Sequence, residues 1–422
     1  MQRYVILVDP YAGAAEFANA FRDRGVEPVA VLSTPGPLNS YRRTWTPEKF
    51  HQVHCYAGDS EDGRNFDDLV ATVRGYDPVA VVPGNESAVM LVDRLIAALA
   101  PGTENALELS EARRDKWAMA QALEAGGVPP LRQIATGDMD EAAAWIVRNG
   151  LEGRPLVLKP CRSGGTDDVH KVAEGEDWRP YFKRLLGSVN RFDLTNDLVL
   201  IQEFAEGAEY VVDTYSVDGR FGLVTVSRYS KWAKGDRIGV YDCLDYLQPD
   251  DPLVAVLGDY TRRVAEAVGV RNGPTHTEVI LTSDGPRLIE IAARLVGSCL
   301  NYSARLATGD CHIDRTVRHC LDGPGTFTEG YRILRPVRVV WLTSPREGIL
   351  RNAEVFNAVQ DLPSFQRMAL PYANGEQVPV TEDLFTSLGW VILAADDQAA
   401  LDTDTRRVKE IQGRVIVEPV RR

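Results

Sequence analysis

Apolar and polar residues along the first hundred positions follow two different periods. Short apolar runs typical of buried strands occur at residues 4–9, 27–33 and 78–84. Residues 13–25 and 86–100 instead repeat their apolar positions every three to four residues, which is the period of an amphipathic helix. Strands that alternate with helices in this way predict a parallel sheet with helices on its faces.

A second region is predicted to begin after residues 98–105, where Pro and Gly interrupt the pattern. Residues 110–127 indicate a helix, with Ser110 as its N-cap and with Gly126 and Gly127 beyond its end. The chain that follows mixes strands and helices.

Two β-hairpins are predicted further along the chain. An Asp218-Gly219 turn between apolar segments is a strong signal for the first hairpin. The second turns at residues 283–285, between two strands of alternating pattern. Its alternation predicts one inward face that carries His276, Glu278 and Ile280 from the first strand and Leu288, Glu290, Ala292 and Arg294 from the second.

Two glutamates would face each other in this second hairpin if it is centred on Asp284. Glu278 then lies opposite Glu290 with Cβ atoms about 4.5–5.5 Å apart, and like charges at that separation destabilise a sheet. A Mg²⁺ ion would compensate them, because oxygen-only ligands suit this metal. A shared proton, or a register that moves one glutamate to solvent, are the alternatives. Arg294 on the same face favours the metal, since arginine beside a metal-carboxylate pair is suited to hold a γ-phosphate.

Length and composition narrow the function classes. A chain of 422 residues predicts two or three domains, and 44% apolar with 25% charged residues is typical of soluble globular proteins. A net charge of -13 argues against binding to nucleic acid, and no stretch approaches the ~20 apolar residues of a membrane span. The six scattered cysteines and the absence of a signal-peptide pattern predict a cytoplasmic protein with reduced thiols.

A cation followed by a glycine loop marks the end of one predicted strand. Lys159 ends the apolar run 156–158, and residues 163–166 have the sequence SGGT. Glycines allow backbone N–H groups to approach an anion, and the lysine adds a point charge, so this stretch predicts a phosphate site. A hairpin turn beside a surface lysine explains it equally well. The chain contains neither a G-x-G-x-x-G dinucleotide motif nor a P-loop.

The pairs Cys311-His312 and His319-Cys320 make a zinc site conceivable. A helix through this segment would separate the two pairs onto different faces, which argues against it.

The ordered set of motifs resembles the ATP-grasp ligases, and within them the carboxylate–amine (L-amino acid) ligases that make dipeptides and amide-containing natural products. In chain order the motifs are RRDKWAM (113–119), LVLKP (156–160), SGGTDDV (163–169), IQEFAEGAEY (201–210), THTEV (275–279) and LIEIAAR (288–294). The resemblance implies an α/β ATP-grasp fold. It would comprise an N-terminal parallel α/β domain (1–100), a two-lobed ATP-binding region (101–329) whose flexible lobe spans about 126–205, and a small C-terminal α/β cap (330–422).

The resemblance also implies roles for individual residues. ATP would be bound by Lys116, Lys159, Ser163, Gly164, Gly165, Thr166, Glu203, Phe204, Ala205 and Glu209. Within this set the lysines would contact the phosphates, the glycine loop would close over them, residues 203–205 would contact the adenine, and Glu209 the ribose. Glu278 and Glu290 would bind one or two Mg²⁺ or Mn²⁺ ions, and Arg294 and Lys159 would be catalytic. Substrate contacts would come from Glu86, Tyr241, Asp242, His276, Arg294, Gly297 and Ser298.

Three points stay open within this resemblance. Many family members have asparagine where this chain has Ala292, so one metal ligand is missing. Glu86 is also explained as an acidic residue in the first turn of a helix, where the helix dipole favours negative charge. Tyr241, Asp242 and Asp245 also suit an exposed acidic turn.

The predicted reaction converts a carboxylate to an acyl phosphate with ATP, after which an amine attacks and an amide, ADP and phosphate are released. The predicted partners are therefore small-molecule carboxylates and amines, with a possible homodimer. A carboxylase or a phosphotransferase of the same superfamily is the alternative.

Overall fold

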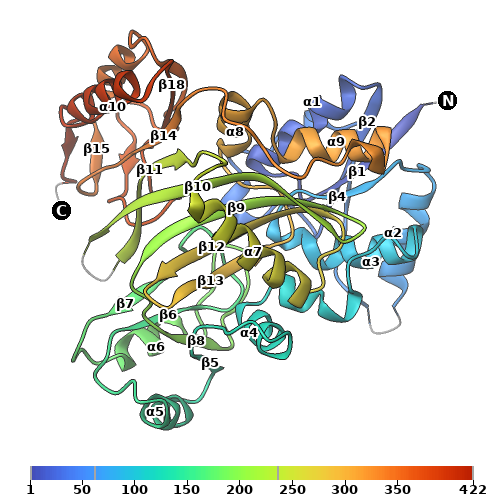
Figure 1. Cartoon of the computed structure of the whole chain (residues 1–422), viewed down its shortest axis with the longest axis horizontal. Coiled ribbons are helices and arrows are strands. Elements are labelled where there is room, and N and C mark those ends of the chain that lie inside the picture. The colour runs from blue at the N-terminus through green and yellow to red at the C-terminus, as the bar shows by residue number, and fades with distance from the viewer. Residues whose placement is uncertain (1, 61–62, 235–236, 421–422) are drawn as a thin grey trace.

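The computed structural model describes residues 2–60, 63–234 and 237–420. Its N-terminal domain is built on a parallel sheet in the order β3-β2-β1-β4, as the alternating pattern predicts (Figure 1). The strands are β1 (Arg3–Val8), β2 (Val26–Leu32), β3 (Gln52–Cys55) and β4 (Val81–Pro83), and the helices that cover them are α1 (Glu16–Arg22), α2 (Arg64–Arg74) and α3 (Val89–Leu99). Apolar residues from both faces of this sheet are buried against these helices.

The helix after the first domain begins later than predicted. α4 (Lys116–Ala125) has Asp115 as its N-cap, because the Asp115 carboxylate accepts the backbone N–H groups of the first turn. Ser110, the predicted N-cap, lies in 3-10 turns and donates its hydroxyl to Asp93, so that prediction is wrong. Gly126 ends the helix, as predicted.

A small antiparallel sheet follows, in the order β5-β8-β6-β7. Its strands are β5 (Gln133–Thr136), β6 (Leu156–Pro160), β7 (His170–Val172) and β8 (Val199–Glu203), and it packs against α5 (Met139–Arg148) and α6 (Arg179–Leu185). These elements lie within the predicted flexible lobe.

The largest sheet has eight strands in the order β13-β12-β9-β10-β11-β14-β18-β16. They are β9 (Ala208–Val217), β10 (Arg220–Lys234), β11 (Arg237–Tyr246), β12 (Gly273–Thr282), β13 (Gly285–Ala292), β14 (Val337–Leu342), β16 (Phe365–Ala369) and β18 (Gly389–Ala394). α7 (Pro252–Ala267) packs on its β9, β10 and β13 side. Because β11 pairs with β14, the sheet continues from the predicted ATP-binding region into the C-terminal segment.

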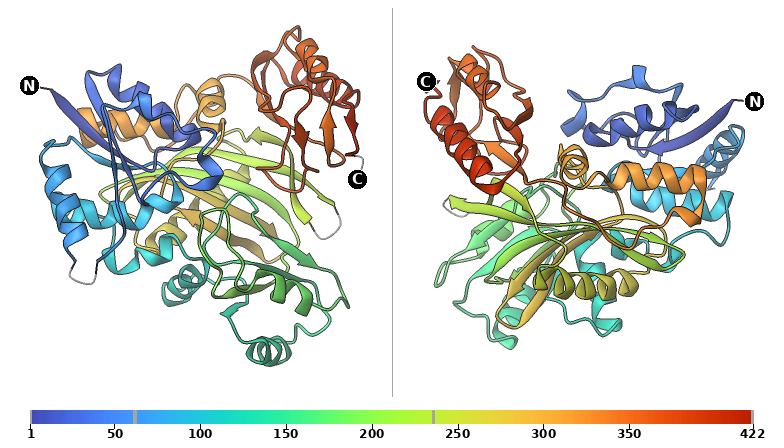
Figure 2. Two further views of the ribbon diagram at one scale, coloured as in Figure 1. Left: turned by 180° about the vertical axis from the view of Figure 1, so that it is seen from behind. Right: turned by 45° about the horizontal axis from the view of Figure 1, so that its top comes forward.

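The C-terminal segment completes the fold with α10 (Gln398–Gln412) and a three-stranded sheet of β15 (Gly348–Leu350), β17 (Gln377–Val378) and β19 (Val417–Glu418). α8 (Leu300–Thr308) and α9 (His312–Asp322) lie earlier, and α9 packs against α1. Figure 2 shows the N-terminal domain and the C-terminal segment on opposite sides of the molecule. The short 3-10 helices are η1 (Ala12–Ala15), η2 (Asn39–Tyr41), η3 (Pro47–Lys49), η4 (Glu86–Ala88), η5 (Leu107–Leu109), η6 (Glu111–Arg113), η7 (Pro324–Thr326) and η8 (Ala353–Val359).

The hairpin β12–β13 contains a bulge that the alternating pattern did not predict. Glu278 pairs with Glu290, as predicted, but Val279 pairs with Leu288, so Ile289 is an extra residue in the second strand. Leu288 therefore packs with Val279 in the core beneath α7, and the prediction that it shares a face with Glu290 is wrong. The turn itself has two residues, since Thr282 pairs with Gly285.

The Asp218-Gly219 turn between β9 and β10 is confirmed, with φ angles of 50° and 81° at its two residues. In the part of the chain that the structure describes, no helix combines the length and the apolar character needed to cross a bilayer.

Candidate active site

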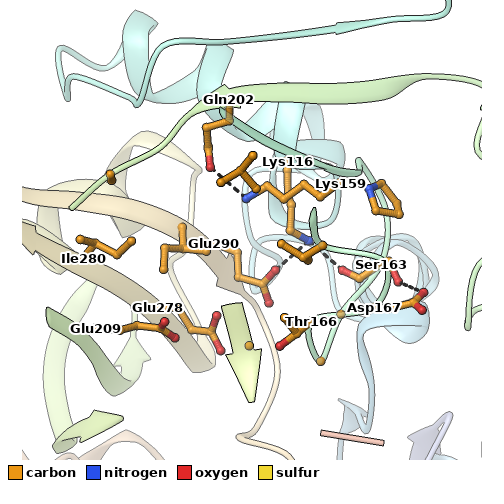
Figure 3. Close-up of a pocket in the computed structure, with 18 of the residues that line it drawn as sticks. Lys116, Lys159, Ser163, Thr166, Asp167, Gln202, Glu209, Glu278, Ile280 and Glu290 are labelled. Atoms are coloured by element: carbon orange, nitrogen blue, oxygen red, sulfur yellow. Dashed lines mark hydrogen bonds and ion pairs between the residues drawn. The ribbon is translucent and has the colours of Figure 1, made fainter. Parts of the chain in front are cut away.

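A cavity of about 110 Å³ lies between the small antiparallel sheet and the β9–β13 half of the large sheet (Figure 3). Most of the predicted ATP-binding and metal-binding residues line it, although they come from five separate segments of the chain. They are Lys116, Lys159, Ser163, Gly164, Gly165, Thr166, Phe204, Ala205, Glu209, Glu278 and Glu290.

Two buried lysines provide positive charge on one side of this cavity. The Lys116 Nζ lies 2.7 Å from Glu290 Oε2 and donates to the Ser163 carbonyl at 2.7 Å. The Lys159 Nζ donates to Gln202 Oε1 at 3.2 Å (Figure 3). Burial, together with the charge of Lys116, lowers the pKa of Lys159 to about 8. The cavity therefore contains cationic charge that is costly to bury and that an anionic ligand would stabilise.

The paired glutamates lie on the other side, on neighbouring strands. Burial favours protonation of Glu278, but the His276 imidazole and the Lys231 and Lys116 ammonium groups outweigh it and lower the pKa of Glu278 to about 2. Glu278 is thus a carboxylate at neutral pH, and with Glu290 it offers oxygen ligands to a divalent metal.

His276 lies behind Glu278. Its Nδ1 is 2.8 Å from Asp213 Oδ1, and its Nε2 is 3.6 Å from Glu278 Oε1. Burial opposes protonation, but the Asp213 carboxylate raises the pKa of His276 to about 9. The predicted substrate residue His276 therefore contacts other protein groups and supports Glu278.

Glu209 forms an ion pair with Lys231, whose Nζ lies 2.5 Å from Glu209 Oε1. The Lys231 ammonium also lies 4.2 Å from the centre of the buried Tyr241 ring. The Tyr241 hydroxyl accepts a long hydrogen bond of 3.5 Å from Thr166 in the glycine loop. Tyr241 thus contacts two residues that line the cavity, Thr166 and Lys231.

Arg294 and Glu86 meet beside the glycine loop although they come from different domains. Arg294 Nη2 lies 2.7 Å from Glu86 Oε1, and Arg114 Nη1 lies 3.8 Å from Glu86 Oε2. Burial favours protonation of Glu86, but the two guanidinium groups lower its pKa below the usual value. A Cβ added to Gly164 would lie 2.9 Å from Glu86 Oε2, so this charged cluster touches the loop.

Gly297, Ser298 and Asp242 are among the predicted substrate residues that do not line the cavity. Gly297 and Ser298 connect β13 to α8, and a Cβ on Gly13 would lie 2.5 Å from the Ser298 carbonyl, so this connection touches the N-terminal domain. Asp242 pairs with Lys409 of α10, in a separate charged groove. Its position does not support the predicted contact with substrate. The neighbouring candidate Asp245 lies in the same groove and pairs with Arg338 at 2.6 Å.

Glu203, a predicted nucleotide-binding residue, does not line the cavity, although its neighbours Gln202 and Phe204 do. Its carboxylate pairs with Arg132 at 2.6 Å, and its backbone N–H donates to the Arg132 carbonyl. Phe204 and Ala205, which follow it, line the cavity.

Sequence patterns missed several residues of this site. Lys231, Gln202 and Asp167 line the cavity, and Arg114 lies against Glu86. Gln202 lies inside the motif IQEFAEGAEY and Arg114 inside RRDKWAM, but nothing in the alternation of apolar and polar residues separates them from their neighbours. Lys231 is on β10, and only the pairing of β10 with β9 brings it to Glu209.

A zinc site is not present among the residues that the structure describes, where no group of three or more metal-ligating side chains occurs. Both ring nitrogens of His312 already have partners, the Val296 N–H and the Thr214 carbonyl. Mg²⁺ needs fewer protein ligands, because one or two carboxylates together with phosphate oxygens and water complete its coordination. Glu278 and Glu290 fit that requirement.

Residues 152–302 match the family model of the ATP-grasp domain. The chain is 30% identical over 419 residues to dapdiamide A synthase of Enterobacter agglomerans. This alignment covers 97% of this chain and 95% of that protein. It is 25% identical over 201 residues to the L-arginine-specific L-amino acid ligase of Bacillus subtilis, 47% of this chain and 46% of that protein. The crystal structure of an L-amino acid ligase from Bacillus licheniformis matches with a TM-score of 0.76 at 15% identity and covers 99% of both chains.

The chain belongs to the ATP-grasp family. It is an ATP-dependent ligase that joins a carboxylate to an amine and forms a C–N bond, and the fold and activity implied by its motifs are confirmed. Enzymes of this family use ATP and generally Mg²⁺.

Proposed function

We propose that the cavity binds ATP, with Lys116, Lys159 and the glycine loop on its phosphates. The backbone of Phe204 and Ala205 contacts the adenine, and Glu209 accepts hydrogen bonds from the ribose. One observation supports this most strongly: two buried lysines and two facing glutamates line the same cavity as the glycine loop. Phosphates compensate the lysines, and a metal compensates the glutamates.

Glu278 and Glu290 hold Mg²⁺ in this proposal. When bound, the ion neutralises charge on the phosphates and orients them. Ala292 cannot supply an oxygen, so the protein provides two carboxylates for one well-held ion, and a second ion depends on phosphate and water. The Lys116 Nζ lies 2.7 Å from Glu290 Oε2, so the same lysine would contact a metal ligand and the phosphates in this proposal.

In this proposal Arg294 stabilises the acyl phosphate. The carboxylate oxygen of the substrate attacks the γ-phosphorus and ADP leaves. The amine then attacks the acyl carbon, phosphate leaves with the C–O bond electrons, and the amine loses a proton to solvent or buffer. Each step changes charge on oxygen, and fixed cations lower its barrier. Arg294 with its planar fork suits both the phosphoryl and the carboxylate oxygens.

The substrates are proposed to be amino acids or related small acids and amines. The named relatives include an L-amino acid ligase and a dapdiamide synthase. The buried cluster of Glu86, Arg294 and Arg114 offers one carboxylate and two guanidinium groups beside the glycine loop. Such a cluster suits a zwitterion, whose ammonium and carboxylate each find an opposite charge.

A substrate screen tests this proposal. Purified protein with Mg·ATP is combined with pairs of amino acids and small carboxylic acids, and ADP and phosphate release are measured together with product mass. Release that requires both a carboxylate and an amine supports the proposed substrates. Release with bicarbonate, or with a carboxylate alone, would support the carboxylase or phosphotransferase alternative.

A homodimer and a cytoplasmic location remain predictions. Sedimentation velocity tests the first, and fractionation of cells tests the second.

A further inference from the structure

The glycine loop is held by a contact within its own segment and by contacts from distant parts of the chain. Thr166 and Asp168 are non-glycine residues with φ angles of 65° and 50°, and Gly165 between Gly164 and Thr166 has a φ of 68°. Such left-handed backbone is costly for residues with a Cβ, and surrounding contacts must hold it. The nearest contact inside the loop runs from Ser163 Oγ to Asp167 Oδ2 at 2.6 Å (Figure 3).

Arg191 lies outside this loop and forms hydrogen bonds to it. Its backbone N–H donates to Asp167 Oδ2 at 3.0 Å, and its Nε donates to Asp167 Oδ1 at 3.1 Å. Both oxygens of the loop carboxylate are therefore held by one residue, which fixes the position of Asp167 and, through it, of Ser163. Asp167 is itself buried.

The same guanidinium reaches the C-terminal segment. Arg191 Nη2 donates to Asp383 Oδ2 at 2.8 Å, although the two residues are 192 positions apart. Its carbon Cζ lies 4.6 Å from the centre of the Phe385 ring. Asp383 is oriented in turn by Thr386, whose backbone N–H and hydroxyl both donate to Asp383 Oδ1.

Phe385 also touches the loop directly. A Cβ on Gly165 would lie 2.4 Å from Phe385 Cε2, so the ring covers the backbone of the loop and only glycine fits beneath it. The residues around Arg191 contact the N-terminal domain as well, since Ser40 Oγ donates to the Arg191 carbonyl at 2.7 Å. The loop is thus held between parts of the chain that lie far apart in the sequence.

We propose that Arg191 is a positioning residue for nucleotide binding, which holds the glycine loop over the triphosphate by joining Asp167 to Asp383 of the C-terminal segment. Arg191 does not line the cavity and contacts the loop, so it acts through Asp167. The C-terminal segment thereby takes part in nucleotide affinity, although none of its residues up to 420, where the described part of the chain ends, lines the cavity. This inference rests on the proposed ATP site.

Calorimetry with Mg·AMP-PNP and Mg·ADP tests the inference without any need to know the carboxylate or the amine. Arg191→Ala should weaken Mg·AMP-PNP binding by about tenfold and Mg·ADP binding by less, because the loop covers the terminal phosphate. Arg191→Lys should recover only part of the loss, since lysine cannot reach two carboxylates with a planar fork. A merely structural role would lower thermal stability without changing the ratio of the two affinities.

A double-mutant comparison examines the connection itself. Asp383→Ala should weaken Mg·AMP-PNP binding by several-fold. The double variant Arg191→Ala/Asp383→Ala should bind Mg·AMP-PNP about as tightly as whichever single variant has the lower affinity, because both substitutions break the same connection. Arg179→Ala is the matched control, because Arg179 lies on the same lobe and forms an exposed pair with Asp177. It should bind both nucleotides as wild type does.

The outcomes separate this inference from the proposed site. If wild type fails to bind Mg·AMP-PNP, the proposed ATP site is wrong. If wild type binds but Arg191→Ala and Asp383→Ala stay within twofold of it, only the role of Arg191 is overturned. Should Arg191→Ala not fold, Asp383→Asn and Phe385→Leu test the same contacts from the C-terminal side, and unchanged affinity in both would equally overturn it.

Discussion

The hairpin β12–β13 and the glycine loop face each other across one cavity, yet they are built in opposite ways. The hairpin brings Glu278 opposite Glu290 through strand pairing within a single short stretch of chain. The loop takes its shape from Arg191, Phe385 and, through Arg191, Asp383. One side of the site is therefore encoded locally, and the other depends on tertiary contacts.

This difference predicts how each side fails. Loss of a hairpin glutamate removes a group that no other residue replaces, so its effect on chemistry should be large. Loss of one loop contact leaves the other contacts in place, so its effect should be smaller and fall on binding.

Glu290→Ala should lower ADP formation by more than about a thousandfold, roughly 4 kcal/mol. The variant removes one of two proposed metal ligands and leaves Lys116 without the carboxylate that lies 2.7 Å away. Turnover is compared with Glu266→Ala, an exposed glutamate on α7, and circular dichroism checks the fold. Near-normal ADP production would show that the glutamate pair is structural.

Arg294→Ala should lower kcat by about 10²–10³, since an oxyanion-type contact contributes roughly 3–4 kcal/mol. The KM for ATP should rise much less, because the contact strengthens only as charge develops on the transferred group. Steady-state kinetics at saturating ATP measures both. Arg294→Lys should not restore kcat, and a kcat within about threefold of wild type in both variants would contradict the assignment.

Gly165→Ala should weaken Mg·AMP-PNP binding by about tenfold, as the added methyl collides with Phe385. Gly175→Ala is the matched control, because its φ of 75° is similar and its added methyl would meet nothing within 4 Å. The control variant therefore shows only the energetic cost of placing alanine in a left-handed backbone conformation. If the two variants bind equally well, the ring does not shape the loop.

The affinity for nucleotide should change a few-fold with pH because of Lys159. Its pKa of about 8 means that it loses its proton as pH rises through 8, and phosphates bind the protonated form better. Affinity should therefore fall above pH 8, and binding near that pH should take up a proton. Calorimetry in buffers of different ionisation enthalpy measures the uptake, and Lys159→Met should abolish it.

The lowered pKa of Lys159 also predicts that the free energy of unfolding of the nucleotide-free protein depends on pH. Because the unfolded lysine titrates near 10.4, the unfolded chain binds more protons between pH 8 and that value. The contribution of Lys159 to the free energy of unfolding should thus rise with pH in that window. Thermal unfolding of wild type and Lys159→Met, compared across it, provides the check.

Much of the fold could be predicted from the sequence, because short stretches of chain carry the patterns that indicate strands, helices and turns. Alternation between strand and helix periods is enough to indicate the parallel sheet, and a short turn is enough to indicate each hairpin. The bulge at Ile289 was not predictable from alternation, since an extra residue leaves the composition of the strand unchanged. The helix start at Lys116 was misplaced because Ser110 and Asp115 are both good N-caps, and only packing decides between them.

The sequence by itself indicated many of the chemical groups at the site, among them Lys116, Lys159, the glycine loop, the facing glutamates and Arg294, but it did not indicate Lys231, Gln202 or Asp167. Tertiary structure alone decided which of them meet. It joined Arg294 to Glu86 of the other domain, turned Asp242 away towards Lys409, and brought Lys231 to Glu209. Contacts within one hairpin follow from strand pairing, a local property, whereas contacts between domains depend on how whole sheets pack, and no short pattern in the chain records that.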